Sequence, residues 1–168
     1  EKRKLLEKKL KEKAGKINTF PLSFAQQRLW FLNQFESDQA IYNLPSAFKL
    51  IGKMDFEALK KSINEIVKRH ESLRTVFTII RDEPVQVILK TIEIDIPFLD
   101  FQNLQKSEQT DKIKQLIMED VSTGFDLKKG PLLRLKVIKT APEEHVIVLA
   151  MHHIISDGWS MGVFTREI

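Results

Sequence analysis

The chain has 168 residues, 42% hydrophobic and 30% charged, a balance typical of a folded globular protein. It contains no cysteine, which excludes disulfides, thiolate catalysis and zinc sites built on cysteine. The net charge is +4, but residues 1–16 hold eight basic and three acidic side chains, so the rest of the chain sums to −1. We therefore expect no nucleic-acid-binding face.

The first part of the chain differs in composition from the rest. Residues 1–19 are predicted to form a basic helical linker, with a contact helix for a neighbouring domain as the alternative. No apolar run approaches the roughly 18–20 residues that span a bilayer, and the charged start does not resemble a secretory signal. We expect no membrane association and a cytoplasmic location, which the lack of cysteine also suits.

Helices are expected where apolar residues recur every three or four positions. Ser23 is predicted to be the N-cap of an aromatic-rich helix, in which Trp30 and Phe31 are expected to be core residues. Asp55 is predicted to cap the next helix. The further helices are predicted at residues 56–67, 113–121 and 159–168.

Strands are expected in short β-branched runs and where apolar and polar residues alternate. They are predicted at residues 44–51, 75–80, 85–89, 92–96, 133–137 and 146–151, with a hairpin turn at 81–84. Arg134 and Lys136 alternate with apolar residues, which predicts one buried face and one face in water. The unbroken apolar run 146–151 predicts a strand covered on both faces. The alternation of helices and strands indicates an α/β fold with a mixed sheet.

The segment that carries chemistry is 151–160, Met-His-His-Ile-Ile-Ser-Asp-Gly-Trp-Ser. Consecutive residues at a strand end point to opposite faces, so only one of His152 and His153 is expected to face a given cleft. Asp157 and Gly158 predict a tight loop that folds back beside the strand. Such a loop can hold an imidazole at a cleft, where its near-neutral pKa suits proton transfer.

Three other interpretations of these residues stay open at this point. A metal site would use His152, His153 and Asp157, but ligands four residues apart favour one helix face, and the preceding run predicts a strand. We therefore predict no metal. A catalytic triad through Ser156 or Ser160 is disfavoured, because adjacent loop residues seldom converge in that way. The histidines could also be ordinary core and turn residues.

The segment matches the HHxxxDG motif of the condensation domains of nonribosomal peptide synthetases. Three further stretches resemble that family's motifs, in the family's order: residues 21–30 (Pro-Leu-Ser-Phe-Ala-Gln-Gln-Arg-Leu-Trp), 69–77 (Arg-His-Glu-Ser-Leu-Arg-Thr-Val-Phe) and 124–134. HHxxxDG alone is moderately specific, since other acyltransferases carry the shorter HxxxDG. Four matches in order identify the chain as a member of this family.

The resemblance implies a chloramphenicol-acetyltransferase-like sandwich lobe, with a mixed β-sheet and flanking helices. Residues 20–168 are expected to be the amino-terminal lobe of a truncated condensation domain whose carboxy-terminal lobe is absent. The family joins a donor acyl or peptidyl thioester to the amine of an acceptor aminoacyl thioester. No cofactor is expected to bind directly, because phosphopantetheine arms arrive on upstream and downstream peptidyl carrier domains. An adjacent adenylation domain is a further expected partner, and the isolated lobe is expected to be inactive.

The resemblance also assigns roles to the residues of the histidine motif. His153 is the expected catalytic residue, which either deprotonates the attacking amine or positions it. His152 is expected to pack on the opposite face and to matter for folding. Gly158 is expected to let the backbone approach the substrate, while the following N–H stabilises a developing oxyanion.

The remaining site residues are expected to support the motif or to line the substrate channel. Asp157 is expected to be a buried structural carboxylate, which needs a charged partner. Arg69 is the first candidate for that partner and Arg74 the second. Trp159 and Ser160 are predicted to line the channel, with a helix cap as the alternative for Ser160.

Alternatives to peptide-bond formation remain at the level of the sequence. An epimerisation domain shares HHxxxDG, although residues 23–31 and 69–75 fit condensation better. A non-catalytic binding or structural lobe and an acyltransferase using coenzyme A are the others. Heterocyclising relatives carry aspartates in place of the histidines and are disfavoured. The ending Ser-Asp-Gly-Trp-Ser resembles the subtype that accepts an L-configured upstream residue.

Overall fold

The computed structural model describes residues 18–35 and 40–168. The predicted basic linker lies outside these ranges except for its last two residues, which begin strand β1. Within the described ranges, no helix combines the length and the hydropathy that a bilayer crossing requires.

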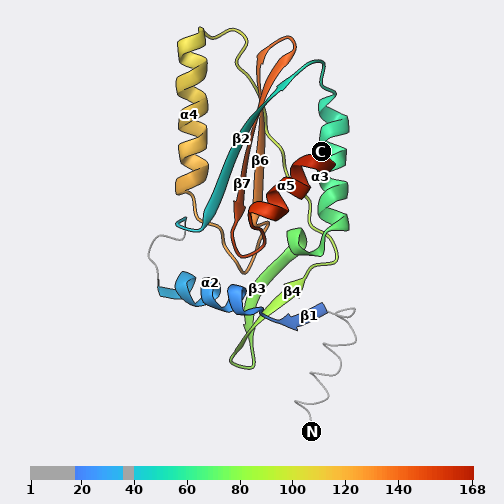
Figure 1. Cartoon of the computed structure of the whole chain (residues 1–168), viewed down its shortest axis with the longest axis vertical. Helices are drawn as coiled ribbons and strands as arrows, with labels where there is room; N and C mark the ends of the chain where they lie inside the picture. Colours follow the sequence, from blue (N-terminus) through green and yellow to red (C-terminus); the bar gives the residue numbers. More distant parts are fainter. Residues whose placement is uncertain (1–17, 36–39) are drawn as a thin grey trace.

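The strands form two sheets, as Figure 1 shows. The larger sheet has the order β2 (Asn43–Ile51), β7 (Glu144–His152), β6 (Leu133–Ala141) and β5 (Phe98–Asp100). Only β5 runs parallel to its neighbour, so this sheet is mixed, as predicted. The smaller, antiparallel sheet has the order β1 (Asn18–Pro21), β4 (Glu83–Ile88) and β3 (Thr75–Ile80).

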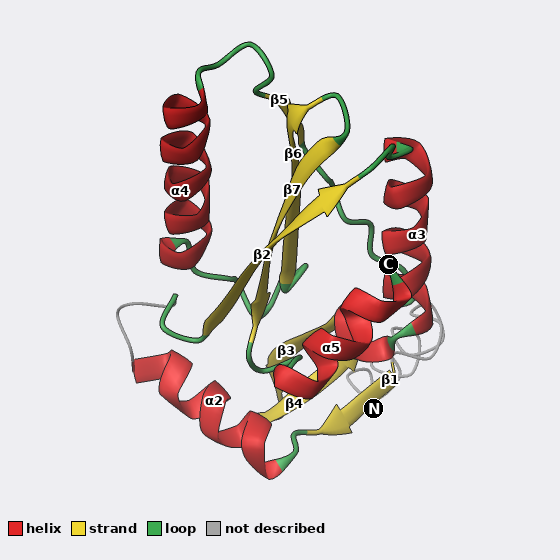
Figure 2. Ribbon diagram, turned by 45° about the horizontal axis from the view of Figure 1, so that its top comes forward, coloured by secondary structure: helices red, strands yellow, loops and turns green. Residues whose placement is uncertain are grey.

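Helices cover both faces of the larger sheet. Figures 1 and 2 show α4 on one side of this sheet and α3 with α5 on the other, while α2 lies near the smaller sheet. The bounds are α2 (Phe24–Phe35), α3 (Phe56–Arg69), the short 3-10 helix η1 (Glu71–Arg74), α4 (Lys106–Ser122) and α5 (Gly158–Glu167). All four predicted helices in the described residues are thus confirmed.

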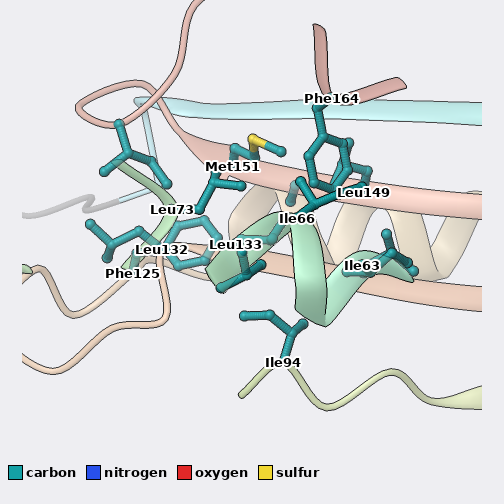
Figure 3. Packing of buried hydrophobic residues seen from close by; sticks show 14 of the residues in the cluster. Ile63, Ile66, Leu73, Ile94, Phe125, Leu132, Leu133, Leu149, Met151 and Phe164 are labelled. Atoms are coloured by element: carbon teal, nitrogen blue, oxygen red, sulfur yellow. The ribbon is translucent and has the colours of Figure 1, made fainter. Parts of the chain in front are cut away.

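The apolar core lies between α3, α5 and one face of the larger sheet (Figure 3). Ile63 and Ile66 of α3 and Phe164 of α5 pack against the alternate residues of β6 and β7 that point to this side, including Leu133 and Leu149. Burial of this kind contributes roughly 1.5–3 kcal/mol for each large aliphatic or aromatic side chain. The core therefore fixes the strand from which the histidine motif emerges.

The α4 side of the sheet is covered by polar contacts, which corrects the prediction that Arg134 and Lys136 face water. Both side chains are mostly covered, and both approach the buried Asp120 of α4. Lys136 Nζ lies 2.6 Å from Asp120 Oδ1, and Arg134 Nε lies 3.8 Å from the same oxygen. The alternation of charged and apolar residues marked a second buried interface, because long cationic side chains can be buried when they are paired.

Both predicted N-caps are confirmed. Ser23 Oγ accepts from Gln26 N–H at 3.3 Å, and Gln26 Oε1 accepts from Ser23 N–H at 2.9 Å, a reciprocal capping box. Asp55 Oδ1 accepts from Ala58 N–H at 3.0 Å. Trp30 is 6% exposed, as expected for the core. The prediction for Phe31 is wrong: it is 59% exposed, because it lies on the outer side of the helix.

The predicted strand at 92–96 is not formed, although its alternation correctly indicated burial. Ile94 and Ile96 are buried, but residues 91–97 belong to neither sheet. The side-chain amide of Asn64 accepts from Ile94 N–H at 2.9 Å and donates to Ile94 C=O at 3.3 Å. A side chain thus takes the place of a neighbouring strand, since backbone polar groups need partners of some kind.

The hairpin between β3 and β4 is confirmed, with a shorter turn than predicted. Ile80 pairs with Glu83, so the turn consists of Arg81 and Asp82 alone. Both have positive φ, 55° and 64°, as a two-residue type I′ turn requires. L-residues other than asparagine and aspartate adopt this region at a cost.

We predict that Arg81→Gly raises the free energy of unfolding by about 0.5–1 kcal/mol, because positive φ is costly for arginine and glycine adopts it without a steric penalty. Urea unfolding monitored by circular dichroism measures the change. Gly52→Ala is the opposing control, since Gly52 has φ of 124° and open space around an added Cβ, and it should lower stability. A loss of stability in Arg81→Gly would contradict the assigned turn.

Candidate active site

His153 is the first residue after β7, at the start of the loop that leads to α5. Its backbone N–H donates to the carbonyl of Tyr42 at 2.9 Å, which continues the pairing of β7 with β2 by one residue. Its ring Nδ1 lies 2.7 Å from the carbonyl oxygen of Ser156. Backbone and ring are therefore both anchored, one to β2 and one to the loop itself.

The bond to Ser156 defines the state of the His153 ring. A carbonyl oxygen only accepts hydrogen bonds, so Nδ1 must carry the proton of this contact. In the neutral ring, the lone pair is then on Nε2. This is the tautomer that a general base or an amine-positioning group needs, with one nitrogen held and the other available.

His153 is exposed and lines a cleft of about 610 Å³. One wall of the cleft is the side of α2 that carries Gln26, Arg28 and Leu32; the other is the loop from His153 to Asp157, together with Tyr42. The motif at 21–30 and the histidine motif thus meet at one cleft, although they are far apart in the sequence. The volume lies within the roughly 300–1,000 Å³ usual for small-molecule sites.

His152 faces the other way and is fully buried, as predicted. Its Nδ1 accepts from Ile154 N–H at 3.1 Å, and its ring meets the edge of Phe125 at a centroid distance of 6.2 Å. Burial, with a smaller contribution from the charge of His153, lowers the pKa of His152 to about 4. The ring is thus neutral at neutral pH and packs inside the fold.

The predicted pairing of Asp157 with an arginine is wrong for the described residues. Asp157 is exposed and is the N-cap of α5: its Oδ1 accepts from Ser160 N–H at 2.8 Å and from Ser160 Oγ at 2.6 Å. These bonds from Ser160 hold the pKa of Asp157 below its usual value. The carboxylate is satisfied locally, because a helix start supplies unpaired N–H groups.

Arg69 and Arg74, the two arginines predicted to pair with Asp157, bind other residues. Arg69 Nη1 lies 3.3 Å from Glu167 Oε2, at the far end of α5, and His70 Nε2 lies 2.9 Å from the same oxygen. Arg74 pairs with Glu71 at 3.2 Å and donates to the carbonyl of Leu89. Arg69 therefore supports the helix of the motif through its last turn, not through Asp157.

The other predicted site residues lie at the start of α5. Trp159 is 77% exposed and lines a separate cavity of about 160 Å³, whereas Ser160 lines both this cavity and the cleft of His153. Gly158 has open space around an added Cβ, which leaves room for an approaching molecule. The N–H groups of Trp159 and Ser160 face the carboxylate of Asp157, and this arrangement does not favour the expected oxyanion role for the N–H after Gly158.

Metal ligation has no support within the part of the chain that the structure describes, where no three histidine, aspartate or glutamate side chains gather. Sequence reasoning missed a polar cluster behind the histidine motif, formed by the buried Asn43 and Asp120 and the partly buried Arg134. The sequence offered one signal for this cluster: Asn43 stands at the start of a strand, and asparagine is depleted in strands.

We predict that the stability of the fold falls between pH 6.5 and pH 4 because of His152. The unfolded chain binds a proton at its imidazole near pH 6.5, and the folded chain only near pH 4, so acid favours unfolding. This contribution is complete well above pH 6.5, and roughly 1 kcal/mol of it is lost at pH 5.5. Urea unfolding at pH 7.5 and 5.5 measures the difference.

His152→Asn, whose Oδ1 can replace Nδ1 as acceptor, should flatten this pH dependence. His145→Gln is the control, because burial also lowers the pKa of His145 and its removal should leave the contribution of His152 in place. An equal pH dependence in His152→Asn and the unmodified chain would refute the assignment.

We predict that Asp157→Ala lowers the free energy of unfolding by about 1 kcal/mol, the usual cost of losing an N-cap. Asp55→Ala is the matched control, since Asp55 caps α3 in the same way far from the cleft. Urea unfolding at pH 7 compares the two. A loss of more than about 3 kcal/mol for Asp157→Ala alone would instead indicate the buried ion pair that the sequence suggested.

Comparison with known proteins agrees with this geometry. The family model of the condensation domain matches residues 16–168. A linear gramicidin synthase of Brevibacillus parabrevis is 45% identical over 88% of the chain, and bacitracin synthase 2 of Bacillus licheniformis is 38% identical over 93%. The chain spans only 2% and 6% of the length of these two relatives.

Solved structures confirm the predicted chloramphenicol-acetyltransferase-like fold. The starter condensation domain of rhizomide synthetase RzmA superposes with a TM-score of 0.80 at 24% identity, covering 89% of this chain and 36% of that one. The four-domain nonribosomal peptide synthetase holo-AB3403 superposes with a TM-score of 0.76 at 22% identity, covering 90% and 11%. With the family model matching residues 16–168, which include every described residue, the chain belongs to the condensation domain family of nonribosomal peptide synthetases.

Proposed function

We propose that the chain forms the His153 side of the active site of a peptide-bond-forming condensation domain. The reaction joins a carrier-bound donor acyl or peptidyl thioester to the amine of a carrier-bound acceptor aminoacyl thioester. The observation that carries the proposal is the presentation of His153. Its ring is held at Nδ1 by the carbonyl of Ser156 at 2.7 Å, on an open cleft of about 610 Å³.

The proposed step needs one proton acceptor. The acceptor amine attacks the thioester carbon, a carbon–nitrogen bond forms, the carbon–sulfur bond breaks, and the donor sulfur leaves as a thiol. The amine must lose a proton in this step, and the departing sulfur must gain one to become a thiol. The lone pair on Nε2 of His153 is suited to receive the amine proton and return it to the sulfur, or to hold the amine by a hydrogen bond while the proton passes to the sulfur. The tautomer set by Ser156 favours both roles equally.

The phosphopantetheine arms of the carriers are substrate tethers in this proposal, not resident cofactors. The cleft has the volume for a small molecule, and Gln26, Arg28 and Ser160 give it polar positions. A mutant of the rhizomide starter condensation domain, 23% identical to this chain, was solved in complex with C8-CoA and Leu-SNAC. We propose that upstream and downstream carrier domains deliver the two thioesters, and that an adenylation domain is adjacent.

The chain covers 36% of the solved starter domain that it matches. We propose that a second lobe supplies the other wall of the reaction site, and that the isolated chain binds without turning over. A single wall leaves the reacting groups in water, where positioning and electrostatic stabilisation are weak.

We predict that His153→Ala in the complete domain lowers the rate of dipeptidyl-carrier formation by at least about 10²-fold, the usual contribution of a general base. The complete domain is supplied with a donor-loaded and an acceptor-loaded carrier protein, and the product is followed by mass spectrometry. His145→Gln is the matched control, because His145 lies at the other end of the same strand.

The outcomes separate the candidate functions. A loss of about 10²–10⁴-fold supports a general base, and a smaller loss supports an amine-positioning role. An unchanged rate in His153→Ala contradicts both. Exchange of solvent deuterium at the donor α-carbon, without amide formation, would indicate that the domain catalyses epimerisation and not condensation.

A further inference from the structure

The end of α4 is attached to the sheet directly behind the histidine motif, and Asn43 makes the attachment. Asn43 is buried at the first position of β2. Its side-chain Nδ2 donates to the carbonyls of Asp120, Val121 and Thr123, at 3.0, 3.1 and 2.8 Å. The carbonyls of Asp120 and Val121 lie in the last turn of α4 and that of Thr123 at its C-cap, where the helix offers them no partner of its own. The two N–H groups of one amide, one of them shared between two carbonyls, thus bind the carboxyl end of a helix from a neighbouring strand.

The backbone of Asn43 is part of the same strand pair as the histidines. Asn43 is opposite His152 in the register of β2 and β7, and the carbonyl of the preceding residue, Tyr42, accepts from His153 N–H at 2.9 Å. The position of His153 therefore depends on where the first residues of β2 lie. Those residues are held by α4 through the side chain of Asn43.

A second attachment comes from the other side of β7. Arg134 on β6 donates to the carbonyls of Gly124 and Thr123, and its guanidinium lies 3.8 Å from the centroid of the Phe125 ring. The ring of Phe125 in turn meets His152 edge-on. Both neighbours of β7 are thus fastened to the same helix end, at the level of the histidine motif.

We propose that Asn43 is a positioning residue for His153, acting through β2 and the carbonyl of Tyr42. This rests on the proposed function, because it assigns Asn43 to the same reaction. Asn43 does not line the cleft, so its effect is on geometry and not on substrate contact. Misplacement of a reacting group by about 1 Å can cost about 10²-fold in rate, so a small displacement of β2 is sufficient.

The test compares Asn43→Leu with a matched control. Asn43→Leu keeps the approximate shape and removes the donor, and Asn43→Ser is a milder variant that keeps one donor. The control is Asn64→Leu, since Asn64 also joins a helix to an extended segment by its side-chain amide, at Ile94, but far along the fold from His153. Thermal unfolding first establishes a temperature at which all variants are folded.

Two readouts are measured at that temperature. The first is turnover by the complete domain with loaded carrier proteins, separated into kcat and KM for the acceptor carrier. The second is the ring tautomer of His153 in this chain, from long-range ¹H–¹⁵N correlation spectra above pH 7.5. The ring spectrum needs no substrate, so it reports on positioning even where turnover cannot be measured.

The expected result is a loss in kcat of about 10- to 100-fold for Asn43→Leu, with KM changed less than about threefold. Asn43→Ser should lie between this variant and the unmodified protein. The Nδ1–H signature of His153 should give way to a mixture of tautomers in Asn43→Leu and persist in Asn64→Leu.

An unchanged ring spectrum in Asn43→Leu, with a kcat no lower than that of Asn64→Leu, would overturn the proposal. An unmodified domain that forms no amide from loaded carriers would count against the proposed function alone. In that case, a ring spectrum that responds to Asn43→Leu and not to Asn64→Leu would still support positioning.

Discussion

The geometry of the site follows from the way that β7 ends. At this point, strand alternation turns His152 into the α4 side of the sheet, and the next residue leaves the strand towards the cleft. Burial keeps His152 neutral, and its Nδ1 accepts from the N–H of Ile154, which turns the chain into the loop. The ring of His153 is then fixed by the carbonyl of Ser156 only three residues on. A buried imidazole thus shapes the loop that presents an exposed one.

The two faces of the larger sheet stabilise this strand end by different physical means. The side of α3 and α5 is an apolar core, whose burial supplies free energy without specifying direction. The α4 side holds a buried carboxylate, Asp120, paired with Lys136 and Arg134, and an amide that caps a helix. Hydrogen bonds and ion pairs in low dielectric demand particular geometry, because an unpaired partner is costly there. The apolar face therefore supplies stability, and the polar face on the α4 side fixes the relative positions of the strands and the helix.

Helix α5 joins the motif to the rest of the fold at both of its ends. Its first turn is capped by Asp157, and its last turn is tied to the end of α3, where Glu167 meets His70 and Arg69. The acidic residue of the HHxxxDG motif thus orders the helix that follows the loop, within the part of the chain that the structure describes. This explains how an exposed carboxylate supports the histidine without touching it.

The family, the helices, most strands and the opposite placement of His152 and His153 could all be predicted from the sequence, because apolar periodicity and the order of motifs can be read along the chain. The burial of Ile94 and Ile96 was predictable too, but not that Asn64 would replace a neighbouring strand. Apart from the N-caps Ser23 and Asp55, the partners of charged and polar groups emerged from the tertiary structure alone. Asp157 bonds three residues ahead, whereas Arg69 reaches Glu167 nearly a hundred positions away. The partner that a side chain binds depends on which elements the packing brings within hydrogen-bond distance of it. A local sequence pattern does not specify which distant elements those are.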